Sequence, residues 1–511
     1  MVRSMRETER KYEVPSSADF SWLSELERVD GVRSVVGPSA RELDAVYYDT
    51  EDLRLHGSSV TLRRRSGGSD AGWHLKLPLP GDSREEIRSA PADDVPGAML
   101  DLSMSRTRGA ELTPVVRVRT HREVWHLMDA QGARRAELSV DAVRAESLRA
   151  KGARTAWREV EVELAEETAD AALLDAVDAE LRGKGLVLVR SSSKFARALA
   201  ETGAAPAAGA DGSAGEAGPA GEPVLAYLRE QVEALTALDP AVRRDRPDAV
   251  HRMRVACRRL RSCLRSYRSV LDREVTDAVR DELKWLGGEL GVERDHEVLM
   301  KRLTHGVDAL PGELVLGPVT ARLQVWDVAG MSEAHQRTLD ALGSRRYRAL
   351  LDALAALVER PPLRAGAGRK ADKVMARAVL KEFDRLADRM TTALALSPGP
   401  RRDTALHEAR KAAKKVRYAA EVARPALGKP AKRLGKRAKS VQRVLGDHQD
   451  SVVARDTIRD LAVAARTASE TGFTWGLLYG RQEAVAADRE RELPAVWKRA
   501  SKPVLRKRLR P

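Results

Sequence analysis

Residues 5–14 read MRETERKYEV, and Glu7, Glu9 and Lys11 recur there at every second position. Successive side chains of a β-strand point to opposite faces, so these three share one face of an extended strand. The same alternation recurs in residues 60–65 (VTLRRR), 72–78 (GWHLKLP), 114–120 (PVVRVRT) and 157–164 (WREVEVEL). The first 200 residues are therefore predicted to form strands that each carry one charged face and one apolar face.

The charges on these strands are sorted by sign. Carboxylates lie on the first and last stretches, whereas the middle stretches carry arginine and lysine. Amphipathic strands with charged faces in water would explain each strand alone. Helical patterns such as residues 169–182 could instead cover the apolar faces and turn the charges into a barrel or tunnel. Buried charges need partners, and a metal-bound polyphosphate would supply them, since carboxylates bind hard divalent cations and arginine or lysine binds phosphate oxygens.

In order along the chain, these residues resemble the CYTH family of triphosphate tunnel metalloenzymes. Residues 7–11 show the E-x-E-x-K pattern that opens such domains. The match continues through Leu62–Arg65, Lys76, Arg84–Glu86, Arg117, Arg119, Asp141, Glu159–Glu163 and Ser193–Lys194. The resemblance covers residues 1–200 and implies an eight-stranded antiparallel β tunnel with flanking helices, which hydrolyses a triphosphate with Mg²⁺ or Mn²⁺ as cofactor.

The resemblance also implies roles for single residues. Metal ligands would be Glu7 and Glu9, with partners among Glu159, Glu161 and Glu163, of which the pair stays open. Catalytic roles would fall to Glu9, Lys11 and Asp141, the last by completing a metal environment or orienting water. The implied phosphate-binding residues are Lys11, Arg63, Arg65, Lys76, Arg117, Arg119 and Lys194. Phosphoryl transfer depends mostly on positioning and charge neutralisation, so such a tunnel needs no covalent nucleophile.

Residues 201–222 separate two regions of different charge. This stretch is rich in alanine, glycine and proline and has no basic residue, which predicts a flexible linker. Residues 1–200 contain 31 lysine and arginine residues against 34 aspartate and glutamate residues, whereas residues 223–511 contain 59 against 37. The formal charge of +15 on this 511-residue chain therefore comes from the second region, which indicates a polyanionic partner.

The second region contains an internal repeat of basic helices. One copy begins His251-Arg252-Met253-Arg254 and continues VACRRLRSCLRSY, and the other begins His407-Glu408-Ala409-Arg410 and continues KAAKKVRYAAE. LGVERD (residues 290–295) and LGDHQD (residues 445–450) follow, and the separation from the histidine to the final aspartate is 44 and 43 residues, respectively. At about 100° per residue, cations fall on one stripe and apolar residues on another. Each helix is predicted to bury one face and to present a row of cations on another.

This repeat resembles the CHAD domain, an α-helical module named for its histidines, over most of residues 223–511. The resemblance implies a C-terminal all-α pair of pseudo-symmetric helical bundles with a basic channel for inorganic polyphosphate. The implied ligand residues are His251, Arg254, Arg258, Arg259, Arg261, Arg265, His407, Arg410, Lys411, Lys414, Lys415, Arg417, Lys436 and Arg443. Asp295 and Asp450 are expected to orient basic residues or cap helices. A metal is not expected at either leading histidine, because cations surround both.

Together the two resemblances imply a metal-dependent inorganic triphosphatase that acts on tripolyphosphate and whose C-terminal module binds long-chain polyphosphate. The alternatives are a non-catalytic polyphosphate-binding or granule-targeting protein, and a tunnel enzyme that acts on ATP or thiamine triphosphate. No run of about 18 apolar residues predicts a membrane span, and no known motif supports nucleic-acid binding. The two cysteines, Cys257 and Cys263, do not suggest a disulfide framework. We therefore expect a cytoplasmic location, with polyphosphate granules as one site of association.

Overall fold

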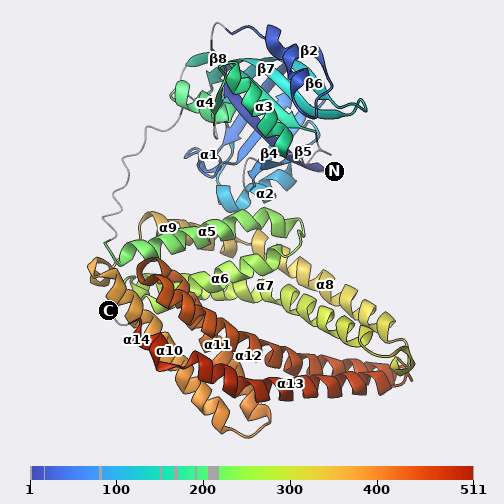
Figure 1. Cartoon of the computed structure of the whole chain (residues 1–511), viewed down its shortest axis with the longest axis vertical. Coiled ribbons are helices and arrows are strands. Elements are labelled where there is room, and N and C mark those ends of the chain that lie inside the picture. The colour runs from blue at the N-terminus through green and yellow to red at the C-terminus, as the bar shows by residue number, and fades with distance from the viewer. Residues whose placement is uncertain are drawn as a thin grey trace. The chain divides into compact units, whose positions relative to one another are not determined.

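The computed structural model describes residues 3–15, 18–79, 83–149, 152–165, 171–189, 193–204 and 218–509. The chain divides into two compact units, Met1–Asp211 and Gly212–Pro511. The predicted linker at 201–222 lies mostly outside the described residues, which omit 205–217. The first unit is built around strands and the second around helices (Figure 1).

The strands of the first unit close into one antiparallel barrel. They are β1 (Arg3–Glu13), β2 (Ser34–Asp49), β3 (Thr61–Ser66), β4 (Gly72–Pro78), β5 (Ser83–Ser89), β6 (Thr113–Met128), β7 (Arg134–Ser147) and β8 (Arg154–Leu164), and the short β9 (Val187–Val189) pairs with the end of β1. Their order is β5-β4-β3-β2-β6-β7-β8-β1, and pairing of β1 with β5 closes the ring. The strand β1 changes partner midway, because Arg3–Thr8 lie opposite β5 and Glu9–Glu13 lie opposite β8. The predicted eight-stranded antiparallel tunnel is confirmed.

Helices cover much of the apolar outer surface of this barrel. The 3-10 helix η1 (Ser21–Arg28) and α3 (Ala171–Gly183) pack onto β1, β7 and β8 through residues such as Leu26 and Val177. The short α1 (Arg54–Gly57) and α2 (Gly97–Thr107) pack in the same way against β3, β4 and β5. With one face of these strands covered, strand alternation directs the other face inward. The charged faces of β1, β3, β4 and β8 therefore line the interior and do not meet bulk water.

The helix α4 (Lys194–Glu201) packs against β6, β7 and β8. The Ser193 hydroxyl accepts a hydrogen bond from the backbone N–H of Ala196 at 3.1 Å and so caps the helix. The Phe195 ring stacks on Tyr47 with 5.0 Å between centroids, within an apolar cluster that includes Val118. Capping and stacking together fix the start of α4, and with it the position of Lys194.

The second unit consists of helices that pack in two successive runs. These are α5 (Gly221–Arg243), α6 (Ala249–Ser266), α7 (Arg273–Asp308) and α8 (Val319–Gly343), then, after α9 (Arg345–Glu359), α10 (Ala371–Ala395), α11 (Pro400–Val422), α12 (Arg424–Thr467), α13 (Phe473–Ala500) and α14 (Pro503–Lys507). In each run, consecutive helices pack together, except that the short α14 packs on α12. Figure 1 shows α7 beside α8 and α12 beside α13 as two long pairs. The two copies of the sequence repeat occupy α6–α7 and α11–α12, as a pair of pseudo-symmetric bundles requires.

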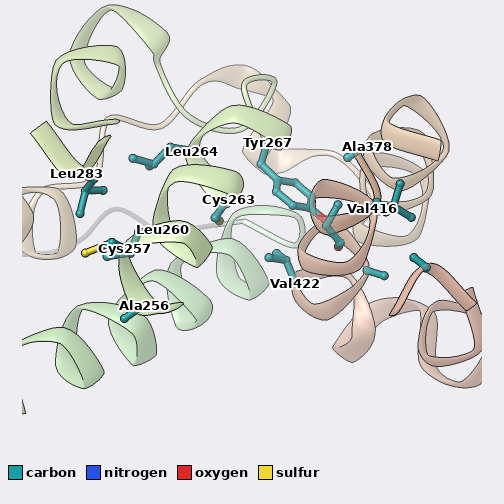
Figure 2. Close-up of a cluster of buried hydrophobic side chains, with 14 of the residues drawn as sticks. Ala256, Cys257, Leu260, Cys263, Leu264, Tyr267, Leu283, Ala378, Val416 and Val422 are labelled. Carbon is teal, nitrogen blue, oxygen red and sulfur yellow. The ribbon is translucent and has the colours of Figure 1, made fainter. Parts of the chain in front are cut away.

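The apolar stripe of α6 lies in the core that joins these two runs. Cys257 and Leu260 are buried, and the Tyr267 hydroxyl donates a hydrogen bond to the backbone carbonyl of Ala419 in α11 at 2.7 Å. Figure 2 shows this stripe with Leu283 of α7 on one side and α11 on the other. Because α6 and α11 are neighbours, their cationic stripes can border one common space.

Candidate functional site

The barrel encloses a cavity of about 300 Å³. The sequence-predicted residues that line it are Glu7, Glu9, Lys11, Arg63, Arg65, Lys76, Glu161, Glu163 and Lys194. Carboxylates enter mainly from β1 and β8, and cations from β3, β4 and the start of α4. The charge sorting seen along the chain is therefore a sorting in space around one cavity.

Lysines and carboxylates pair closely across this cavity. Lys76 Nζ lies 2.6 Å from Glu7 Oε1, and Lys11 Nζ lies 2.5 Å from Glu161 Oε1 and 3.2 Å from Glu9 Oε1. Burial opposes the charge of Lys11, but Glu161 and Glu9 outweigh it and raise its pKa well above the ordinary value. These ammonium groups remain charged at neutral pH, as phosphate binding requires.

Lys194 lies at the centre of a second carboxylate group. Its Nζ is 2.8 Å from Asp141 Oδ2, 2.6 Å from Glu159 Oε1 and 2.7 Å from Glu161 Oε1. Oxygens of these three carboxylates lie within 4.8 Å of one another, a spacing that could hold a cation. The ammonium group of Lys194 forms an ion pair with each of the three carboxylates, so these carboxylates are already neutralised in part by a lysine.

Among the residues that the structure describes, Glu163 forms no ion pair comparable to these. It lies directly opposite Glu9 in the pairing of β1 with β8. Burial, followed by the charge of Glu7, raises the pKa of Glu163 to about 8, and Lys76 opposes this only partly. Carboxylates that repel one another and carry little water fit a hard divalent cation. Among the three candidate partners on β8, Glu163 therefore fits a metal shared with Glu7 and Glu9 best.

Two arginines crowd together on the other side of the cavity. Burial, and next the charge of Arg63, lower the pKa of Arg65. Arg65 pairs with Asp70 at the cavity wall, and Arg63 lies 3.6 Å from Glu86. Like-charged guanidinium groups held together in a poorly hydrated space favour an anion between them.

Two predicted phosphate-binding residues lie elsewhere. The side chain of Arg117 is 41% exposed and that of Arg119 is 57% exposed, both pair with Asp44, and neither lines the cavity. The reason is that Val118 of β6 faces inward, where it lines the cavity and belongs to the same apolar cluster as Phe195, and alternation turns its neighbours outward. Asp141 and Glu159, also predicted at the site, are buried just behind the cavity wall.

The cavity also contains charged residues that the sequence-based assignment of roles omitted. These are Arg41, Asp70, Arg84, Glu86, Arg88, Arg122, Arg134 and Glu137. Arg122 donates to both oxygens of Asp141 at 2.8 and 2.6 Å and to Glu161 at 2.5 Å, so it holds two buried carboxylates in place. The alternation of Arg84, Glu86 and Arg88 in β5 was a signal that could have revealed three of them.

The helical unit has its own basic pocket of about 710 Å³. Predicted residues that line it are Arg258, Arg261, Arg265, Lys411, Lys414 and Lys415, and Arg268, Arg280 and Lys284 join them. Asp281 is the one carboxylate among the described lining residues. The pocket lies between α6, α7 and α11, where the two cationic stripes meet.

Charge in this pocket is poorly compensated. Burial, then Arg410 and Arg258, lower the pKa of Lys414 to about 7. In the described part of the chain, the Nε atoms of Arg258, Arg261 and Arg268 are buried without a hydrogen-bond partner. Buried donors without acceptors are costly, and an anion with many oxygens would satisfy them.

Other predicted polyphosphate ligands are engaged within the protein or lie outside the pocket. Arg254 binds Asp295 at 2.6 and 3.1 Å, and Arg410 binds Asp450 at 3.2 Å, so these aspartates do orient the basic residues. Gly291 and Gly446 of the repeat face these two arginines and leave room for them. The remaining predicted ligands outside the pocket are His251, Arg259, His407, Arg417, Lys436 and Arg443. Of these, Arg259 pairs with Glu421, and Lys436 and Arg443 are exposed on α12.

The two units match two protein families. The CYTH domain model matches residues 5–199, and the CHAD domain model matches residues 226–459. Uncharacterized proteins MT2285 and Rv2226, from two strains of Mycobacterium tuberculosis, are each 40% identical to this chain over 521 residues and cover 98% of it and 98% of their own length.

Two solved structures are similar to parts of the chain. PptA from Streptomyces chartreusis is 24% identical, with a TM-score of 0.46, over 55% of this chain and 99% of its own. HpAC1 from Hippeastrum, described as an adenylyl cyclase candidate with a dominant triphosphatase activity, is 17% identical, with a TM-score of 0.24, over 38% of this chain and 95% of its own. Within the described residues, no helix has the length and apolar character needed to cross a membrane.

Proposed function

Because this chain belongs to the family of proteins that join a CYTH domain to a CHAD domain, we propose that its barrel hydrolyses a triphosphate and that its helical unit binds inorganic polyphosphate. The supporting observation is that like charges crowd together on opposite sides of one cavity. Glu7, Glu9 and Glu163 line one side, where burial and then Glu7 raise the pKa of Glu163, and Arg63 and Arg65 line the other. A metal-bound triphosphate would neutralise both groups.

The tunnel residues divide into three tasks in this proposal. Glu7, Glu9 and Glu163 would hold Mg²⁺ or Mn²⁺, and when bound the metal would neutralise phosphate charge and polarise water. Lys11, Lys76, Arg63 and Arg65 would bind phosphate oxygens. Arg122 and Lys194 would keep the buried carboxylates behind them ionised and fixed, so they are positioning residues.

Tripolyphosphate is the proposed substrate of the barrel. Water would attack the terminal phosphorus and form orthophosphate, while the bond from that phosphorus to the bridging oxygen breaks and pyrophosphate departs with the bridging oxygen. The walls of the cavity offer groups for phosphate oxygens on several strands. ATP and thiamine triphosphate remain the comparison substrates in the test.

The test is phosphate release from tripolyphosphate, long-chain polyphosphate, ATP and thiamine triphosphate, with Mg²⁺ or Mn²⁺. Glu7→Gln and Glu9→Gln should each abolish metal-dependent release and leave polyphosphate binding intact. Glu13→Gln is the matched control, since Glu13 lies on the same strand but outside the cavity. No release by the wild type, or unchanged release in both tunnel variants, would refute the enzymatic proposal.

Polyphosphate binding by the helical unit is tested separately. Binding should weaken steeply with salt, because phosphate contacts release counterions. Charge reversal at Arg258 should weaken it further, whereas reversal at the exposed Lys373 of α10 should not. Binding that is insensitive to salt and to Arg258→Glu would argue against this pocket. Polyphosphate binding by the helical unit would also direct the protein to polyphosphate granules, and fluorescence microscopy can test this location.

A further inference from the structure

Two clusters of histidine and carboxylates lie in the helical unit apart from the basic pocket. One consists of Asp245, Glu293 and His335, and the other of Asp403, His448 and Glu490. Within each cluster, one potential ligand atom from every residue lies within 4.8 Å of the other two. Imidazole and carboxylate groups at this spacing are the usual protein ligands of divalent transition metals.

The two clusters occupy equivalent places in the internal repeat. The register that aligns Asp295 with Asp450 also aligns Glu293 with His448 and His335 with Glu490. Histidine and glutamate have therefore exchanged helices between the copies. The aspartate comes from just before α6 in the first copy and from the first turn of α11 in the second. The second cluster thus serves as an internal comparison for the first.

Arginines neutralise the second cluster. Arg402 Nε lies 3.0 Å from Glu490 Oε2, and Arg455 Nη2 lies 3.4 Å from Asp403 Oδ2. His448 Nε2 is 3.3 Å from Glu490 Oε1 and 3.4 Å from Asp403 Oδ1. Both carboxylates of this cluster already have cationic partners, so it has little need of a metal.

The first cluster lacks the second of these arginines, because Met300 stands at the position of Arg455 in the register that aligns Asp295 with Asp450. The position of Arg402 is held by Arg246 in the register that aligns His251 with His407. Among the residues that the structure describes, neither Asp245 nor Glu293 has a lysine or arginine within ion-pair distance. Two carboxylates beside one imidazole are left without a compensating cation.

Buried atoms of the first cluster face each other without bonding. Glu293 is 7% exposed, and its Oε2 has no hydrogen-bond partner. His335 Nδ1 is also buried without a partner, and it lies 3.5 Å from that oxygen, too far for a good hydrogen bond. A buried carboxylate oxygen without a partner is costly. A cation bound by both atoms would satisfy them together.

We propose that Asp245, Glu293 and His335 bind one divalent transition-metal ion. Two oxygens and one imidazole nitrogen favour such ions over Mg²⁺ and Ca²⁺, which prefer ligand sets of oxygen alone. The three ligands come from the connection between α5 and α6, from α7 and from α8, so the ion would tie these segments together. This site is independent of triphosphate hydrolysis and of polyphosphate binding.

Zn²⁺ is the probe in a calorimetric titration of the full-length protein, with Mg²⁺ in excess to occupy sites made only of carboxylates. One Zn²⁺ should bind per chain, and Glu293→Gln or His335→Gln should each weaken it by at least about tenfold, since even loss of an outer-shell partner costs that much. His448→Gln is the matched control, because it changes the neutralised cluster at the equivalent place, and it should leave the Zn²⁺ affinity unchanged. Glu9→Gln should also leave it unchanged, which separates this site from the tunnel.

Circular dichroism shows whether each variant folds, and Co²⁺ provides a second measurement. The wild type with Co²⁺ should develop visible absorption bands that weaken in His335→Gln and persist in His448→Gln. Zn²⁺ should also raise the melting temperature of the wild type and not that of Glu293→Gln. Absence of Zn²⁺ binding in the wild type would overturn the proposal. The same holds for equal binding in folded Glu293→Gln and His335→Gln proteins, or for loss of binding in His448→Gln.

Discussion

Replacing Lys414 with arginine should remove a pH dependence that we expect for polyphosphate binding. Burial, then repulsion by Arg410, Arg258 and Arg254, lower the pKa of Lys414 to about 7, and only Asp450 opposes this. A bound polyanion would return the pKa toward the ordinary value of 10.5. Protonated Lys414 is therefore the form that binds, and binding takes up a proton where the free side chain has lost it.

The two pKa values give the size of the effect. Below pH 7 the free and bound proteins are both protonated, so affinity should be nearly constant. Above pH 7 the free protein loses the proton, and affinity should fall by up to about tenfold per pH unit. From pH 6 to pH 8 the expected loss is about tenfold, with close to one proton taken up per binding event at pH 8.

The assay is calorimetric titration with long-chain polyphosphate at fixed ionic strength, in buffers of different ionisation enthalpy so that protons can be counted. Lys414→Arg should bind with little pH dependence between pH 7 and pH 8, because arginine stays charged. The pKa of Lys415 is also lowered, so Lys415→Arg measures how much Lys415 contributes to the pH dependence of binding. Lys373→Arg, an exposed control on α10, should keep the wild-type profile. A flat wild-type profile, or an unchanged slope in Lys414→Arg, would refute the reasoning.

Three further predictions concern the barrel and its link to the helical unit. Arg122→Ala should lower the free energy of unfolding by about 3–5 kcal/mol in urea titrations, because it leaves two buried carboxylates short of a partner, whereas Arg119→Ala at the surface should change it by less than about 0.5 kcal/mol. Phe195→Ala should lower the free energy of unfolding by about 3–5 kcal/mol and reduce hydrolysis, because it loosens α4. Phe195→Leu should retain much of the stability and much of the hydrolysis. Unimpaired hydrolysis in Phe195→Ala would contradict this role. If the helical unit delivers polymer to the barrel, Lys414→Glu should slow hydrolysis of long polyphosphate more than of tripolyphosphate, and equal slowing would exclude delivery.

Much of the architecture follows from local periodicity. The alternation of Glu7, Glu9 and Lys11 predicts a strand with one charged face, and the structure has that strand with that face inward. The repeat that begins at His251 and His407 predicts two related helices with cationic stripes, and α6 and α11 carry them. Side-chain direction in strands and helices repeats with a fixed period, so residues that share a face can be read from the chain alone.

Tertiary structure decided which face of β6 points inward and which charges are left without partners. Arg117 and Arg119 alternate as Arg63 and Arg65 do, yet they lie outside because Val118 between them faces the cavity and joins the apolar cluster of Phe195. Likewise, the two copies of the repeat in the helical unit differ at one equivalent position. Arg455 neutralises a carboxylate of the second cluster, whereas Met300 at that position cannot neutralise a carboxylate of the first. The sequence by itself determined the strands, the repeated helices and the residues that share each face. Partnership between charges depends on distances across elements far apart in the chain, and these distances exist only after the elements have packed.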